Sequence, residues 1–129
     1  MDASALVKRY VREDGSDVVR DAMQQADGWF ICRVGFVETV RAVSIAGGST
    51  AANGLRREWP AFAVVEVDER LADHAASLTL ERDLRSLDAL HLAAALVLPG
   101  HDLVFATWDR RQYAAAQAED LQLLPAALP

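Results

Sequence analysis

Short apolar runs alternate with segments of helical periodicity along most of this chain, and the alternation limits the folds available to it. Strands joined through helices usually lie parallel in one sheet, with helices on both faces. We therefore predict an α/β fold around a mostly parallel sheet. The apolar runs predict strands at residues 29–32, 62–67, 103–106 and 121–124. The helical patterns predict helices at residues 4–11, 16–26, 34–46, 50–59, 68–83, 86–98 and 109–118.

Length and composition indicate one globular domain spanning residues 1–129. The chain is 52% hydrophobic and 25% charged, which is typical of folded proteins. A chain of this length buries roughly two-thirds of the surface that its unfolded form exposes, so it can fold without a disulfide or zinc. The breaks at residues 47–50 and 99–100 are interpreted as turns within this domain, not as linkers.

Charge and cysteine content exclude several classes of protein. The net charge of −6 argues against a general DNA-coating protein, although carboxylates that hold metal ions would also count as negative charge. Cys32 is the single cysteine, which excludes an internal disulfide and a cysteine zinc site and favours the reducing cytoplasm. No apolar run approaches the ~18 residues of a membrane span, and no signal peptide is recognisable.

Four acidic residues lie in apolar or tightly patterned surroundings: Asp2, Glu38, Asp88 and Asp109. A buried carboxylate is unfavourable unless it is paired or binds a metal. Asp109 also follows a predicted strand, at the sheet edge where α/β folds place their sites. Four carboxylates meeting there would repel one another, and Mg²⁺ or Mn²⁺ would relieve that repulsion.

Each carboxylate also has a purely local interpretation. Asp2 and Asp109 each precede a predicted helix, and Asp is a preferred N-cap residue. Glu38 could pair with Arg41 one helical turn later.

Asp88 is the least explained of the four by local structure. It could cap its helix or bond to Ser86 or His91, but Ser86 is the more natural cap. His91 follows Asp88 by one turn and could join it as a metal ligand. A hydrogen-bonded helical histidine is the favoured interpretation, because imidazole suits transition metals better than Mg²⁺.

The motifs around these carboxylates resemble those of PIN-domain proteins, specifically the VapC-type ribonuclease toxins of bacterial type II toxin–antitoxin systems. The matching segments follow the family's order and span nearly the whole chain. Residues 84–95 (LRSLDALHLAAA) are the most specific, and residues 106–111 (ATWDRR) come next. Residues 2–8 (DASALVK) and 37–42 (VETVRA) are short and weak alone.

The resemblance implies a three-layer α/β/α sandwich with a five-stranded parallel sheet and an acidic Mg²⁺ site. Asp2 and Asp88 would be the main metal ligands, and Glu38 and Asp109 would complete the cluster. Two hydroxyl residues match family positions that support the site by hydrogen bonds: Ser4 and Thr107.

The implied activity is Mg²⁺-dependent endoribonuclease action on structured RNA, such as a tRNA or a ribosomal RNA loop. Basic residues near the site in sequence could hold RNA phosphates, or they could form an ordinary solvated face. These candidates are Lys8, Arg9, Arg12, Arg110 and Arg111.

The resemblance also implies a VapB-like antitoxin that lays a helix into an apolar groove near the first helices and directs a basic side chain toward the acidic site. A homodimer is expected, with operator DNA bound only through the antitoxin. Trp59 and Phe62 are candidates for a partner-facing patch, whereas Phe30 is expected in the core.

The start of the chain departs from the family pattern. Family members usually carry several apolar residues before the first Asp, and these form the central strand. Only Met1 precedes Asp2 here. We therefore expect either a start upstream of Met1 or a truncated first strand.

Three other functions remain open from the sequence. A haloacid-dehalogenase-like phosphatase would need a second Asp two residues after the first, where this chain has Ser4. A response-regulator receiver would need a late lysine, but the single lysine is Lys8. A catalytically silent PIN-like interaction domain would not need all four carboxylates, and a metal titration would distinguish it from an active nuclease.

Overall fold

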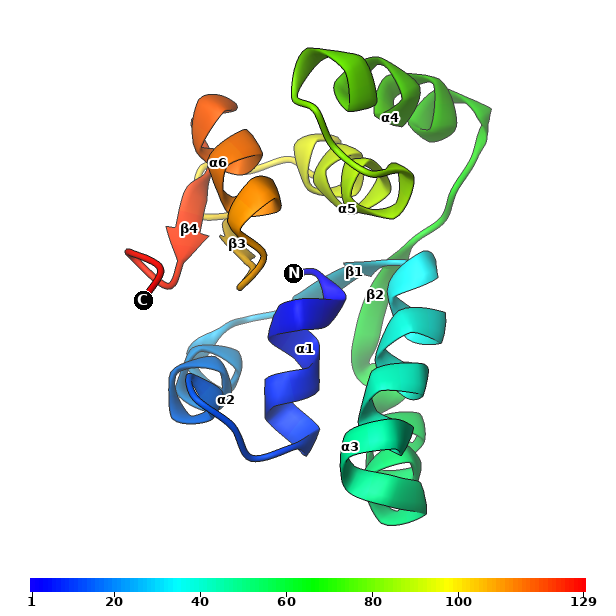
Figure 1. The fold of residues 1–129 in the computed structure, drawn as a ribbon, viewed down its shortest axis with the longest axis vertical. Helices are drawn as coiled ribbons and strands as arrows, with labels where there is room; N and C mark the ends of the chain where they lie inside the picture. Colours follow the sequence, from blue (N-terminus) through cyan, green and yellow to red (C-terminus); the bar gives the residue numbers. More distant parts are fainter.

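Helices and strands alternate as the sequence predicts in the computed structural model, which describes residues 1–129 (Figure 1). The strands are β1 (Trp29–Cys32), β2 (Phe62–Val65), β3 (Val104–Ala106) and β4 (Gln122–Leu124). The helices are α1 (Ala3–Tyr10), α2 (Ser16–Gln25), α3 (Val34–Glu58), α4 (Glu69–Glu81), α5 (Ser86–Leu96) and α6 (Arg110–Ala118). A short 3₁₀ turn, Trp59–Ala61, connects α3 to β2.

The strands form two parallel pairs. In the first pair β1 lies beside β2, and in the second β3 lies beside β4. Parallel pairing and the α/β class are confirmed. The predicted continuous sheet is divided, because β1 and β3 do not pair with each other.

The first two residues lie between the two strand pairs. The α-amino group of Met1 donates to the carbonyl oxygen of Phe30 in β1 at 3.1 Å. The backbone N–H of Asp2 donates to the carbonyl oxygen of Ala106 in β3, also at 3.1 Å. Loss of hydration lowers the pKa of the Met1 α-amino group, and the nearby Asp2 carboxylate acts in the opposite direction. The chain start therefore bridges the two halves of the sheet.

Two apolar cores lie on opposite sides of the strands and give the predicted three layers (Figure 1). Consecutive residues of a strand point to opposite faces. Accordingly, Ile31 packs into the core with α1, α2 and α3, whereas Cys32 packs into the core with α4, α5 and α6. Phe62 belongs to the first core, and the ring of Trp59 stacks on it at 5.2 Å. Phe62 is only 7% exposed, so the predicted partner-facing patch is wrong at Phe62, whereas Trp59 keeps part of its surface exposed.

The long helix α3 changes direction at Gly48. This residue has φ 70° and ψ −166°, a left-handed conformation that glycine adopts without steric penalty. The sequence predicts two helices here, residues 34–46 and 50–59, and the break between them is confirmed. No helix of the chain combines the length and hydrophobicity required to cross a membrane.

Helix α5 occupies the centre of the second core, as its apolar sequence predicts. More than half of its residues are buried: Ala89, His91, Leu92, Ala93, Ala94 and Ala95. The run of alanines lets neighbouring elements approach the helix axis closely. At the amino end of α5, the Gln112 side chain of α6 donates to the carbonyl oxygen of Asp88 at 2.7 Å and holds the two helix starts together.

Truncation of the α5 core should be strongly destabilising. Leu92 is completely buried, so Leu92→Ala should lower the free energy of unfolding by about 2–5 kcal/mol. The same change at Leu80, whose side chain is 87% exposed on α4, should shift it by less than about 0.5 kcal/mol. Urea unfolding of both variants measures the difference, and equal losses would contradict the assigned core.

Candidate active site

Asp2 is buried between the two halves of the fold. One carboxylate oxygen, Oδ1, accepts from the N–H of Ala5 at 3.0 Å and from the Ser4 hydroxyl at 2.7 Å. The other, Oδ2, accepts from the Thr107 hydroxyl at 2.6 Å. The predicted N-cap contact is confirmed, since Asp2 caps α1. These bonds place its carboxylate beside the end of β3.

Glu38 lies on the first turns of α3 and pairs with His91 instead of Arg41. Its Oε2 lies 2.6 Å from Nε2 of His91, whose side chain is almost completely buried on α5. The predicted pair with Arg41 is therefore not made. The favoured interpretation of His91 as a hydrogen-bonded helical histidine is confirmed. The contact joins α3 to α5 and holds one Glu38 oxygen, while Oε1 keeps no partner within the chain.

Asp88 stands on the first turn of α5 and its carboxylate has no hydrogen-bond partner within the chain. Arg85, not Ser86, is the N-cap residue, and it makes no side-chain cap bond. A helix N-terminus favours a carboxylate by about 0.3–1 kcal/mol. Burial nevertheless raises the pKa of Asp88, and the negative charges of Asp109 and Asp2 raise it further.

Asp109 begins α6 directly after β3. Its Oδ1 accepts from the N–H of Gln112 at 2.9 Å, and its own N–H donates to the Thr107 hydroxyl at 3.1 Å. The predicted N-cap role is therefore confirmed. Thr107 connects Asp109 with Asp2 and so fixes two of the carboxylates relative to each other.

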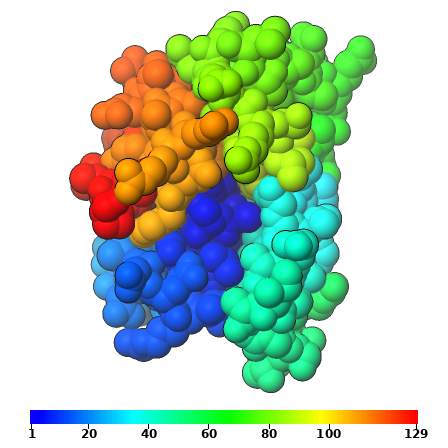
Figure 2. Space-filling view, in the orientation of Figure 1, coloured from blue at the N-terminus to red at the C-terminus, as the bar shows by residue number.

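The chain start lies in a recess of the molecular surface, which we call the hollow. Figure 2 shows the deep-blue chain start recessed between the cyan beginning of α3, the yellow-green α5 and the orange segment from β3 to α6. Asp109, Asp2 and Glu38 all raise the pKa of Asp88 by charge repulsion, which places them within electrostatic range of it. The convergence of these four residues, from four separate segments, on one metal site stays a prediction.

The hollow is not a ready-made metal site. No three His, Cys, Asp or Glu side chains lie close enough together to hold an ion. The donor set nevertheless suits a hard cation, because Asp88 and one oxygen each of Glu38 and Asp109 are free of hydrogen bonds. Mg²⁺ usually binds through one or two carboxylates and retains several waters, so it does not require a closed protein cage.

Lys8 is occupied within the protein. Its buried ammonium donates to the Glu13 carboxylate and to the carbonyl oxygen of Asp14, both at 2.8 Å. It also lies 5.0 Å from the centre of the Trp108 ring. These contacts fix the loop after α1. Because its ammonium is already paired, Lys8 is not free to contact RNA phosphates as predicted.

Arg9 forms a two-pronged ion pair with Glu58, with N–O distances of 2.7 and 2.8 Å. The hydroxyl of Tyr10 donates to the same carboxylate at 2.6 Å. The hydrogen bond from Arg9 holds the pKa of Glu58 below its usual range. Arg9 therefore joins α1 to the end of α3.

Three of the predicted RNA contacts remain on the surface. Arg12 and Arg111 are exposed and have no ion pair within the chain. Arg110 is also exposed and donates to the carbonyl oxygen of Pro129 at 3.1 Å. These guanidinium groups are the basic candidates that can still meet a ligand.

Gln112 is a supporting residue that sequence analysis did not single out. It is completely buried, and its Nε2 donates to the carbonyl oxygen of Asp88 at 2.7 Å. The signal for it was its spacing from Asp109, since Gln three residues after an N-cap is a capping-box pattern. Its side chain reaches α5, so it sets the separation of two carboxylate-bearing helices.

Asp88→Asn should stabilise the metal-free protein. A raised pKa means that folding favours the protonated acid, so this contribution is present at low pH and is lost as pH rises through the raised value. With EDTA at pH 7 the variant should melt a few degrees above wild type. The difference in melting temperature between the variant and wild type should shrink as pH falls toward the ordinary Asp pKa of about 3.9. Asp73→Asn, an exposed control on α4, should not change the melting temperature; an unstabilised Asp88→Asn would contradict the repulsion.

Comparison with known proteins agrees with this geometry. Residues 1–118 match the family described as PIN domain. Ribonuclease VapC49 of Mycobacterium tuberculosis (strain ATCC 25618 / H37Rv) is 32% identical over 136 residues, which covers 98% of this chain and 94% of the relative. Ribonuclease VapC46 of the same strain is 37% identical over 118 residues, covering 91% and 88% respectively. The chain therefore belongs to the PIN-domain family, and within it to the VapC type.

Proposed function

We propose that this protein is a divalent-metal-dependent endoribonuclease that acts as the toxin of a toxin–antitoxin pair. The observation that carries the proposal is the hollow in which Asp88 meets the charges of Asp109, Asp2 and Glu38. Relatives that are named ribonucleases and align along nearly the full chain support the same activity.

The carboxylates would bind Mg²⁺ or Mn²⁺ at the hollow. Asp88 and the unbonded oxygens of Glu38 and Asp109 supply hard ligands, while Asp2 adds charge from a position fixed by its hydrogen bonds. When bound, a divalent ion supplies the Lewis acidity for in-line attack of water on a phosphodiester. Ser4 and Thr107 hold the Asp2 carboxylate, and His91 holds one oxygen of Glu38.

The substrate we infer is a structured RNA with an exposed loop, such as a tRNA or a ribosomal RNA loop. Unpaired loops present their backbone and bases in a form that an open site can reach. Arg12, Arg110 and Arg111 are the exposed guanidinium groups able to contact phosphates on either side of the cleaved bond.

We infer that the partner is a small antitoxin that binds through a helix and blocks the hollow with a basic side chain. Val37 and Ile45 are 69% and 70% exposed and lie eight residues apart on α3, so they share one helix face beside Glu38. A negative hollow next to an apolar strip suits a basic amphipathic partner. The same proposal includes a homodimer that meets operator DNA only through the antitoxin.

Cleavage of total cellular RNA tests the activity. Wild type with Mg²⁺ should give discrete products that disappear with EDTA. Asp88→Asn should reduce the rate by about 100-fold or more, since loss of even a supporting residue of a metal site typically lowers activity 10–100-fold. Asp73→Asn should retain full activity. Cleavage by Asp88→Asn at the wild-type rate, or cleavage unaffected by EDTA, would refute the proposal.

Metal binding can be measured without RNA. Mg²⁺ at about 100 times its dissociation constant should stabilise the wild type by about 2.7 kcal/mol relative to EDTA. Asp88→Asn should lose most of this stabilisation because it removes a charged ligand. Thermal melting with and without Mg²⁺ gives the comparison. A folded wild type that Mg²⁺ does not stabilise would instead favour a silent interaction domain.

A further inference from the structure

The contact between His91 and Glu38 uses one oxygen of the carboxylate. Nε2 of His91 lies 2.6 Å from Oε2 of Glu38. Because a carboxylate can only accept, Nε2 carries the hydrogen of this bond. The His91 side chain is 1% exposed and the Glu38 side chain is 26% exposed. The buried histidine therefore fixes the orientation of the more exposed glutamate.

Close packing between two helices holds the His91 ring. The first turn of α3 approaches the ring at Gly35, where a Cβ atom would lie 3.1 Å from Cε1 of His91. The same Cβ atom would lie 2.6 Å from the side chain of Ile31 in β1. The absence of a side chain at Gly35 thus lets α3 pack onto both β1 and α5. The ring has little room to turn away from Glu38.

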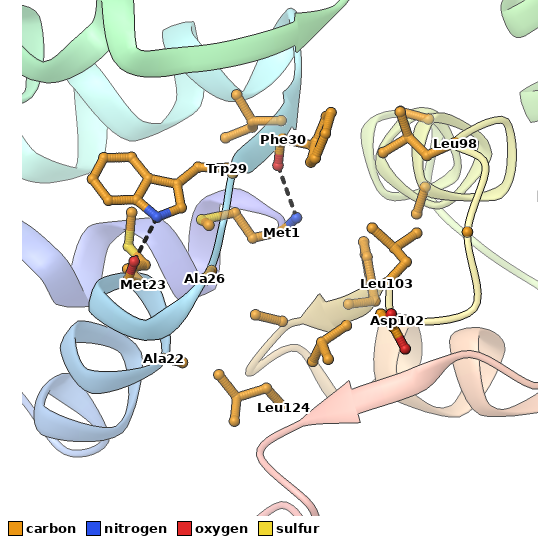
Figure 3. Close-up of a pocket in the computed structure, with 18 of the residues that line it drawn as sticks. Met1, Ala22, Met23, Ala26, Trp29, Phe30, Leu98, Asp102, Leu103 and Leu124 are labelled. Atoms are coloured by element: carbon orange, nitrogen blue, oxygen red, sulfur yellow. Dashed lines mark hydrogen bonds between the residues drawn. The ribbon is translucent and has the colours of Figure 1, made fainter.

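The other nitrogen of the ring, Nδ1, is buried and has no hydrogen-bond partner within the chain. His91 also lines an apolar cavity of about 600 Å³, in which 18 of the 25 lining residues are hydrophobic. Figure 3 shows Trp29, Phe30 and Leu98 beside this cavity. Phe30 is 38% exposed, so its predicted core position is wrong. A buried nitrogen without a partner is unfavourable. Packing alone would thus favour an apolar residue at position 91, and the contact with Glu38 is the polar contact that explains a histidine there.

Hydrogen bonds engage most carboxylate oxygens of the four candidate metal ligands. Both oxygens of Asp2, Oδ1 of Asp109 and Oε2 of Glu38 accept hydrogen bonds, whereas Asp88 keeps both oxygens free. Mg²⁺ binds through one or two carboxylates and retains several waters. Ca²⁺ takes roughly six to eight oxygen ligands and often binds both oxygens of one carboxylate. Glu38 would have to leave His91 in order to offer both of its oxygens.

We propose that His91 makes the metal site selective for Mg²⁺ over Ca²⁺, because it restricts Glu38 to one ligand oxygen. His91 is thus a positioning residue that acts through Glu38 and does not itself bind the ion. The proposal rests on the divalent-metal site of the proposed function and adds a determinant of ion choice to it.

Dissociation constants for Mg²⁺ and Ca²⁺, measured by calorimetric titration of the metal-free protein, test the proposal without RNA. Two apolar variants, His91→Leu and His91→Phe, remove the donor. In both, the ratio of the Ca²⁺ to the Mg²⁺ dissociation constant should fall about tenfold or more, in the range typical for residues that support a metal ligand. His91→Gln keeps an N–H donor and should retain the wild-type ratio. His74→Leu, a matched control at an exposed histidine on α4, should also leave the ratio unchanged. Urea unfolding in EDTA identifies the variants that are folded and can be compared.

Three results would contradict the proposal in distinguishable ways. An unchanged ratio in the folded apolar variants would show that His91 does not set ion choice, while the metal site itself would stand. An equal fall in His91→Gln would show that the ring, and not its hydrogen bond, is responsible. A folded wild type that binds neither ion would refute the metal site, and with it the proposed function.

Discussion

The burial of Asp2 is the constraint on which the rest of the structure depends. Its N–H reaches Ala106 of β3, and its carboxylate accepts hydrogen bonds from Ala5, Ser4 and Thr107. Three neutral donors compensate for the loss of hydration that burial imposes on a charged group. One residue thereby caps α1, ties it to the end of β3 and contributes negative charge to the hollow.

Repulsion among acidic side chains near the same hollow destabilises the fold. Asp88 lies in a helix surrounded by apolar residues, and three neighbouring acids raise its pKa along with burial. Replacing the group by a neutral one would remove this cost, and a structural role alone gives no reason to keep four carboxylates together. A site for a cation gives that reason, because a divalent ion offsets the repulsion when it binds. The proposed metal site therefore lowers the stability of the metal-free protein.

Much of the fold could be predicted because it depends on local pattern, whereas the acidic cluster was predicted from the resemblance to PIN-domain motifs. Apolar runs and helical spacing located every strand and helix, and Gly48 marked the break in α3. Pairing between distant side chains could not be predicted in the same way. Glu38 forms a hydrogen bond with His91, 53 residues away, and not with Arg41, which is one helical turn away. That choice follows from the packing of α3 against α5, which no local pattern encodes.

The internal partners of the basic residues could not be predicted from the sequence either. A charge near the site in sequence was expected to be free for RNA, yet Lys8 and Arg9 are held by Glu13 and Glu58. Acidic partners outnumber basic residues in this chain, 19 to 13, so a basic side chain near the hollow readily finds an internal partner. Contact with phosphates must then rely on the few exposed arginines around a hollow that itself repels phosphate. A bound divalent ion would make the electrostatic potential of the hollow locally positive, so that it attracts phosphate. The proposed function therefore requires RNA binding and metal binding at this site to be coupled, and it predicts that the metal-free protein binds RNA poorly.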